Sequence, residues 1–216
     1  TNTASGGTAT FNSNQGLIDL AVTTTSGSLV YRETKRVFAY QPGKSLCVMT
    51  TFVFSPGKTN LRQRCGYFGT ANGYYIQLNG TTLSFVERTS VSGSLVETTV
   101  NQSSWNVDPL DGTGPSGYTL DPTKSQILWT DLEWLGVGTV RMGFVIEGKF
   151  ILCHMFHHSN VVPSTYITTA CLPIRYELEN TGTTASASTM KQICSTVLSE
   201  GGYEVRGAQQ SIGIPI

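Results

Sequence analysis

Two apolar-rich runs in the second half of the chain constrain its fold more than any other feature. In both Thr139–Ile146 and Phe150–Phe156, β-branched and aromatic residues alternate with smaller or polar ones, and Glu147-Gly148-Lys149 between them is typical of a tight turn. The run Ile127–Trp134 alternates in the same way just before this hairpin. We therefore expect three consecutive antiparallel strands here and place them at the centre of a β-sandwich.

Short alternating runs separated by glycine and proline turns occur along most of the chain. Ser45–Phe54 is the longest apolar run of the first half, so we expect it to be a central strand. Thr189–Leu198 is ambiguous: some apolar residues fit a helical stripe, but its β-branched content favours a strand. The pattern predicts an all-β fold, an antiparallel β-sandwich of the jelly-roll, lectin-like type, with almost no helix.

The same pattern divides the chain into three parts. Residues 1–28 are expected to be an extended lead-in with a first strand, and residues 29–200 the β-sandwich domain. Residues 201–216 are expected to pack on a neighbour or to lead into further chain. Because the chain does not start with Met, we also expect either processing or residues before Thr1.

The low charge of the chain excludes several classes of partner. Charged residues make up 13% and the formal net charge is zero, so we expect neither nucleic acid nor an anionic membrane surface as a partner. No apolar run approaches the roughly 20 residues of a membrane span. The cysteines are odd in number and far apart, which predicts reduced, buried thiols and assembly in a reducing cytoplasm.

Two groups of residues have the types, but not the arrangement, of a metal site. Cys153, His154, His157 and His158 lie in CHMFHH, where strand alternation sends them to opposite faces. We therefore expect no metal and no cofactor, with one imidazole hydrogen-bonded in place. The aspartates of the long loop at 101–124 are expected to make turns and not to bind calcium; they are Asp108, Asp111 and Asp121.

The best candidate for catalysis is a pair of carboxylates on one strand. Asp131 and Glu133 would lie about 7 Å apart on one face, a separation within the range of glycoside hydrolases. The alternative is an ordinary cross-strand charge pair with Arg141 or Lys149, which we favour. We therefore expect no catalytic residue and no enzyme.

Several longer phrases resemble a family of virion structural proteins of tailed bacteriophages, best known from phages of aquatic cyanobacteria. They extend from Tyr31 almost to the end of the chain and are far more specific than a short motif. The phrases are YRETKRVFAYQPGKSL (31–46), NLRQRCGYFGTANG (60–73), WNVDPLDGTGPSG (105–117), ILWTDLEWLGVGTVRMGFVIEGK (127–149), CHMFHHSN (153–160), LPIRYELENTG (172–182) and STMKQICSTVLSEGGYEVRG (188–207).

The resemblance implies a non-enzymatic building block of the particle, in head decoration, a fibre or the tail, that is assembled in the host cytoplasm and located in the virion. Its partners would be other virion proteins and copies of itself. We expect a homotrimer, because Leu110, Tyr118 and the tail offer more apolar surface than one sandwich needs.

The alternative function is a receptor-binding domain of a fibre that grips a host surface glycan. Sugars stack on aromatic rings, so an exposed aromatic cluster would favour it. The candidate ligand or interface surface is Tyr74, Tyr75, Trp105, Leu110 and Tyr118.

Overall fold

The computed structural model describes residues 1–199 as two packed antiparallel sheets of seven strands each. Sheet A consists, in spatial order, of β1 (Asn2–Ala4), β4 (Leu29–Glu33), β13 (Ile174–Asn180), β6 (Leu61–Phe68), β7 (Gly73–Asn79), β8 (Thr82–Thr89) and β9 (Val96–Asn101). Sheet B consists of β12 (Lys149–Phe156), β11 (Val140–Ile146), β10 (Gln126–Leu132), β5 (Leu46–Val53), β14 (Ser188–Ser199), β3 (Leu17–Val22) and β2 (Thr8–Asn12). The fold is an antiparallel β-sandwich of the expected jelly-roll, lectin-like type.

Helix is almost absent from the described residues. A single 3-10 turn, η1 (Gln102–Ser104), interrupts the strands of residues 1–199, and no helix there is long and apolar enough to cross a membrane. The ambiguous run at 189–198 lies within β14, so the strand prediction is confirmed. The tail expected at 201–216 lies outside the described residues.

Strand alternation explains how the core forms. Along β5, Leu46, Val48 and Phe52 are buried toward the opposite sheet. β5 pairs with β10 on one side and β14 on the other, so its predicted central position is confirmed. One large apolar cluster therefore fills the space between the sheets.

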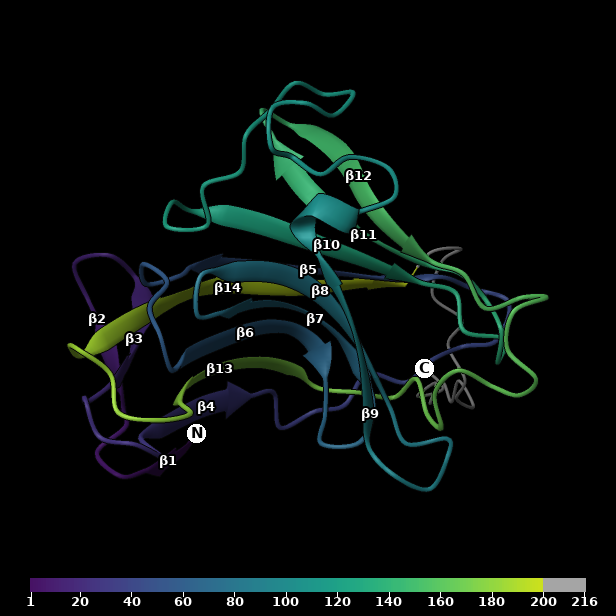
Figure 1. Ribbon diagram of the computed structural model, residues 1–216. Helices are drawn as coiled ribbons and strands as arrows, with labels where there is room; N and C mark the ends of the chain where they lie inside the picture. Colours follow the sequence, from purple (N-terminus) through teal and green to yellow (C-terminus); the bar gives the residue numbers. More distant parts are fainter. Residues whose placement is uncertain (200–216) are drawn as a thin grey trace, which may run out of the picture.

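The hairpin that we expected at the centre of the sandwich lies at an edge. β11 and β12 end sheet B, and Figure 1 shows them at the top of the molecule. Their inward apolar residues are buried in the core, but Phe150 of β12 is 59% exposed and Ile127 of the adjacent β10 is 36% exposed. Apolar density in the sequence therefore overstated how central these strands are.

The first 28 residues are not a lead-in with one strand. β1 pairs with β4 in sheet A, whereas β2 and β3 pair with each other and β3 with β14 in sheet B. β1 and β2 are edge strands with mostly exposed, Thr-rich sequences, so they lack the apolar signal of a strand. The amino-terminal segment is thus part of both sheets.

The long loop after β9 is pinned to the core by Trp105 and Leu110. Both side chains are buried, and the Trp105 ring stacks on Phe85 with centroids 4.2 Å apart. Within the loop, the Asp108 and Asp111 carboxylates accept hydrogen bonds from backbone N–H groups two residues on, and Asp121 does the same. The turn-making roles of these aspartates are confirmed.

Candidate functional site: a charged face on sheet A

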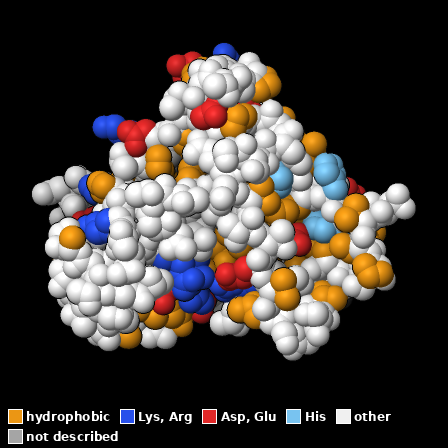
Figure 2. Space-filling view, viewed as in Figure 1, with side chains coloured by type: hydrophobic (Ala, Val, Ile, Leu, Met, Phe, Trp, Pro, Cys, Tyr) orange, Lys and Arg blue, Asp and Glu red, His pale blue; other side chains and the backbone are white. Residues whose placement is uncertain are grey.

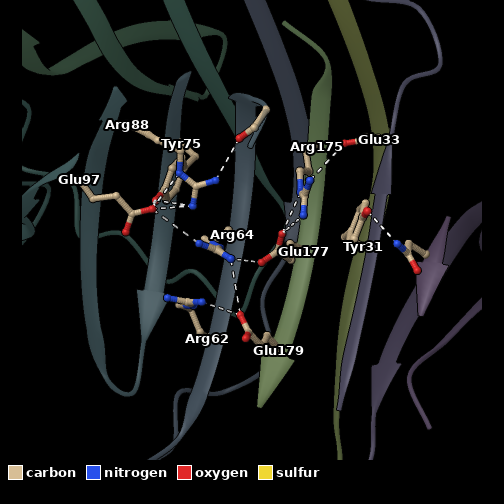
Figure 3. A network of polar contacts seen from close by, with 12 residues as sticks. Tyr31, Glu33, Arg62, Arg64, Tyr75, Arg88, Glu97, Arg175, Glu177 and Glu179 are labelled. Carbon is tan, nitrogen blue, oxygen red and sulfur yellow. Dashed lines mark hydrogen bonds and ion pairs between the residues drawn. The ribbon is translucent and has the colours of Figure 1, made fainter. Parts of the chain in front are cut away.

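The outward face of sheet A carries a row of arginines and glutamates on neighbouring strands. Strand alternation places Tyr67, Tyr74 and Tyr176 inward, and their neighbours in sequence consequently point outward. Register then sets the outward charges opposite one another: Arg64 faces Glu177, Arg62 faces Glu179 and Arg88 faces Glu97. Figure 3 shows these side chains meeting above the strands, and we call them, with Glu33 and Arg175, the sheet A network.

Arg64 is at the centre of the sheet A network. Its guanidinium pairs closely with Glu177 and lies 3.5 Å from Glu179 and 3.9 Å from Glu97. The Glu177 carboxylate in turn accepts a hydrogen bond from the Arg175 guanidinium, with 2.5 Å between nitrogen and oxygen. A single chain of ion pairs therefore joins β13, β6 and β9 across the sheet.

The outer parts of the network extend this chain to both sides. Arg175 pairs with Glu33 of β4 at 3.2 Å, and Arg62 pairs with Glu179 at 2.6 Å. On the other side, Arg88 pairs with Glu97 at 2.5 Å. Each arginine of the network thus has a carboxylate partner.

Aromatic rings hold the guanidinium groups from beside and below. The Arg175 guanidinium lies 3.7 Å from the centroid of Tyr31, and that of Arg88 lies 5.2 Å from the centroid of Tyr75. Tyr75 packs on Phe68 at 4.4 Å and donates its hydroxyl to Glu97 at 2.7 Å. Phe68, Tyr75 and Val86 form a small apolar cluster separate from the main core.

Gly66 makes the packing at this face possible. It pairs with Tyr75 on β7 and with Arg175 on β13, in the middle of the network. A Cβ at this position would lie 2.4 Å from the carbonyl oxygen of Tyr74 and 2.7 Å from the Cα of Tyr75. The absence of a side chain therefore lets β6 and β7 lie together under the network.

The centre of the sheet A network is buried although it lies on an outward face. Arg64 and Arg88 are each 6% exposed and Glu177 is 2% exposed. Burial opposes the charge of Arg64, but the attraction of Glu177 outweighs it and raises the pKa of Arg64. Burial likewise opposes ionisation of Glu177, yet Arg64 and Arg175 together lower its pKa, so both partners are charged.

The solvent-facing rim of this face is mainly acidic. The side chains of Glu33, Glu97 and Glu179 are 40%, 30% and 25% exposed, against 26% for Arg62. Burial raises the pKa of Glu97, but hydrogen bonds from Tyr75 and Arg88 lower it more, which keeps this carboxylate ionised. Figure 2 shows Lys and Arg side chains gathered in a hollow near the lower middle of the molecule, over the region of β13 and β6, with acidic side chains beside them.

This face offers hydrogen-bonding groups at fixed positions. Its paired carboxylates are acceptors and its guanidinium groups are donors. A carboxyl group that acts as a general acid or base must hold or release a proton near neutral pH. The lowered pKa values of Glu97 and Glu177 are opposite to that requirement.

The aromatic surface expected from the sequence does not exist as such. Tyr74, Tyr75 and Leu110 are completely buried and Trp105 is 5% exposed, so the expectation of an exposed cluster is wrong for these residues. Tyr74 and Tyr75 lie in a strand that is covered on both faces, whereas Trp105 and Leu110 pin the long loop to the core. Tyr118 is half-buried and donates its hydroxyl to Glu147.

The two carboxylates considered for catalysis lie in different environments. Asp131 is 5% exposed and pairs with Arg141 on the neighbouring strand, whereas Glu133 lies beyond the end of β10 and is exposed. This confirms the interpretation of Asp131 as a cross-strand charge pair, with Arg141 directly opposite.

The histidines and cysteines near β12 are dispersed. His157 is exposed, whereas the Nδ1 atom of the buried His154 accepts a hydrogen bond from the backbone of Asn106 at 3.2 Å. Within residues 1–199, no three His, Cys, Asp or Glu side chains come together as a metal site. Cys171 and Cys194 are exposed, so the expectation of buried thiols is wrong for these two.

Comparisons with known proteins identify the fold and not a family. No family model and no curated protein matches the chain. Among solved structures, the botulinum neurotoxin serotype C1 binding domain matches with a TM-score of 0.50 and 10% identity over 91% of this chain and 43% of that one. A receptor binding domain matches with a TM-score of 0.51 and 11% identity, over 91% and 42%.

A GH43 glycoside hydrolase engineered for endo-xylanase and exo-arabinofuranosidase activity is also similar, with a TM-score of 0.48, 14% identity and coverage of 86% of this chain and 35% of that one. The chain therefore spans less than half the length of each of these three structures. The similarity to the two binding domains concerns the fold, a lectin-like antiparallel β-sandwich.

Proposed function

We propose that this chain is a non-enzymatic structural domain of a tailed-bacteriophage virion, assembled in the host cytoplasm and contributing to the architecture of the particle. The observation that carries the proposal is the sheet A network, in which arginines and glutamates from β4, β6, β8, β9 and β13 pair with one another. Such internal pairing rigidifies a face and leaves its charges without a catalytic task. The resemblance of the long phrases described above supports the same function.

Purified particles provide the test of this function. Phage particles from a density gradient are digested and the chain is quantified by mass spectrometry against a known head protein. We expect a constant copy number per particle across preparations. A chain that stays in the lysate and is absent from the purified particles would contradict the proposal.

The non-enzymatic part of the proposal needs its own test. In a recombinant phage, Asp131→Asn and His157→Gln alter the carboxylate paired with Arg141 and the exposed imidazole. Particle yield, adsorption and degradation of host polysaccharide should all equal those of the parent. Loss of polysaccharide cleavage with normal assembly and adsorption would identify an enzyme.

A second candidate function is attachment to a host surface glycan through the rim of the sheet A network. The observation that favours it is the set of partly exposed carboxylates beside guanidinium groups on neighbouring strands, since these suit the hydroxyls of a neutral polysaccharide. Tyr31, half-buried beside Arg175, adds a ring at the same face.

Glu97→Gln tests this second function because Glu97 is a partly exposed acceptor of the rim. Removing a charged acceptor should weaken binding of purified host polysaccharide about tenfold or more, measured by calorimetry. Glu147→Gln is the matched control, since this exposed carboxylate lies in the β11–β12 turn, away from the network. Equal binding by both variants would rule out the rim as the glycan site.

A further inference from the structure

A pocket of about 370 Å³ opens between the end of β8, the start of β9 and the connection at 162–166. Glu87 contributes a carboxylate to its lining and Tyr166 an aromatic ring, and none of the network arginines lines it. Its size lies at the lower end of the roughly 300–1,000 Å³ that small-molecule sites occupy. Four apolar side chains form much of the wall: Val91, Val96, Val162 and Pro163.

The carboxylate of Glu87 is held by one of its two oxygens. Oε2 lies 2.6 Å from Nε2 of His158 and accepts a hydrogen bond from the hydroxyl of Tyr74. Both His158 and Tyr74 are buried, so they hold the carboxylate from the protein side. Within residues 1–199 the hydrogen bonds of this carboxylate all involve Oε2, and Glu87 lines the pocket, so Oε1 is the acceptor that a bound molecule would use.

His158 is fixed from both sides of its ring. Nδ1 lies 2.6 Å from the carbonyl oxygen of Gly138, which can only accept a hydrogen bond, so Nδ1 donates to it. Nε2 lies 2.6 Å from Oε2 of Glu87. These contacts hold the Glu87 carboxylate in one position at the pocket.

Tyr166 adds an aromatic wall to the pocket. Its ring stacks on the His158 ring with centroids 3.8 Å apart and an interplanar angle of 13°. The side chain is 3% exposed and its hydroxyl is buried, so Tyr166 contributes its ring and not its hydroxyl to the pocket.

We infer that this pocket binds the acetamido group of an N-acetylated sugar. The amide N–H would donate to Oε1 of Glu87 and the methyl group would lie against the valine and proline wall. Hydroxyls of the ring would meet the Ser and Thr side chains at the mouth, which include Thr89 and Ser164. The inference rests on the second proposed function and names a sugar class and a site for it, separate from the sheet A network.

Titration by NMR with monosaccharides tests the inference. N-acetylglucosamine, N-acetylgalactosamine and N-acetylmannosamine are each compared with the parent hexose that lacks the acetamido group. We expect at least one N-acetylated sugar to bind about tenfold or more tightly than its parent hexose, because the hexose leaves Oε1 without the amide donor. Equal binding of every sugar and its parent, or no binding of any of them, overturns the inference.

Two neighbouring valines provide the matched variants. Val162→Trp fills the pocket while keeping both Glu87 and His158, and should abolish the acetamido preference. Val161→Trp changes the adjacent residue, which is 68% exposed and does not line the pocket, and should bind as the parent does. Retained preference in Val162→Trp would overturn the site.

The same titrations separate this site from the rim of the network. Loss of polysaccharide binding in Glu97→Gln with a normal acetamido preference would leave the pocket intact. The reverse result would place all recognition in the pocket.

Discussion

Arg64 and Glu177 face each other on β6 and β13, 113 positions apart in the sequence, and form an ion pair that is buried although it lies on the outward face of sheet A. Within residues 1–199, their neighbours in the network cover them, and no further strand lies over them. Desolvation of two charges is expensive, so this pair is stable only while each charge keeps its partners. The contribution of the network to the stability of the fold can therefore be measured by removing one charge at a time.

Glu177→Gln should lower the free energy of unfolding by about 3 kcal/mol, because it leaves Arg64 and Arg175 buried without their shared carboxylate. Denaturation in urea measures the change. Glu179→Gln is the control on the same face: its side chain is 25% exposed, and its loss should cost less than about 1 kcal/mol. Equal costs for the two variants would show that burial does not set the strength of these pairs.

Replacing both central charges should be milder than replacing one. The double variant Arg64→Met/Glu177→Met removes the desolvation of both groups and should be more stable than Glu177→Met alone. The same urea titrations measure it. A double variant less stable than Glu177→Met would mean that Arg64 stabilises the face even when Glu177 is absent, and not only by neutralising its charge.

Stability should fall in acid because of Glu97 and Glu177. Both have a pKa lowered in the folded state, so their contribution is present above the unfolded value of about 4.3 and is lost as the pH falls through the lower folded values. Urea midpoints measured from pH 7 down to about pH 3 should therefore decline most at the acidic end. The decline should be shallower in Glu177→Gln, and an unchanged slope in that variant would contradict the assignment.

Gly66→Ala should destabilise the sandwich by about 2 kcal/mol or more, because its Cβ would collide with the backbone of β7 at Tyr74 and Tyr75. Thermal unfolding measures the loss. Gly69→Ala is the control, since the nearest atoms to its added Cβ lie 3.7 Å away at Pro173. Similar unfolding temperatures for the two variants would show that β6 can shift away from β7 and accommodate the added Cβ.

The fold could be predicted because local sequence encodes it. The long apolar run at 45–54 indicated the central strand β5, and glycine and proline turns separated the strands. Alternation along β13 places Arg175, Glu177 and Glu179 together on one face, which is the signal for the network that the sequence offered. Their partners on β6 lie more than a hundred positions away, and only strand order brings them adjacent.

The error about the aromatic residues has a related cause. Tyr74 and Tyr75 are consecutive on β7, so one must point inward and the other outward, and both were expected to be accessible. Tyr74 enters the core, and Tyr75 is covered by Arg88 and its neighbours on the outer face. An outward strand position indicates exposure only when no long side chains close over it.

Self-association remains a prediction, now on different residues. Leu110 is buried and cannot contribute the apolar surface first assigned to it, whereas Phe150 is 59% exposed on the outer face of sheet B, beside Trp129. We expect a trimer at micromolar concentration by light scattering and a smaller mass for Phe150→Glu. A stable monomer of the parent chain would contradict this prediction.

The central claim is that this sandwich is a structural part of a virus particle, and electron cryo-microscopy of purified particles tests it most directly. The account predicts density that fits the two seven-stranded sheets at symmetry-related positions of the head, fibre or tail. A reconstruction of the complete particle in which every such density is assigned to other chains, with none left for this one, would contradict it.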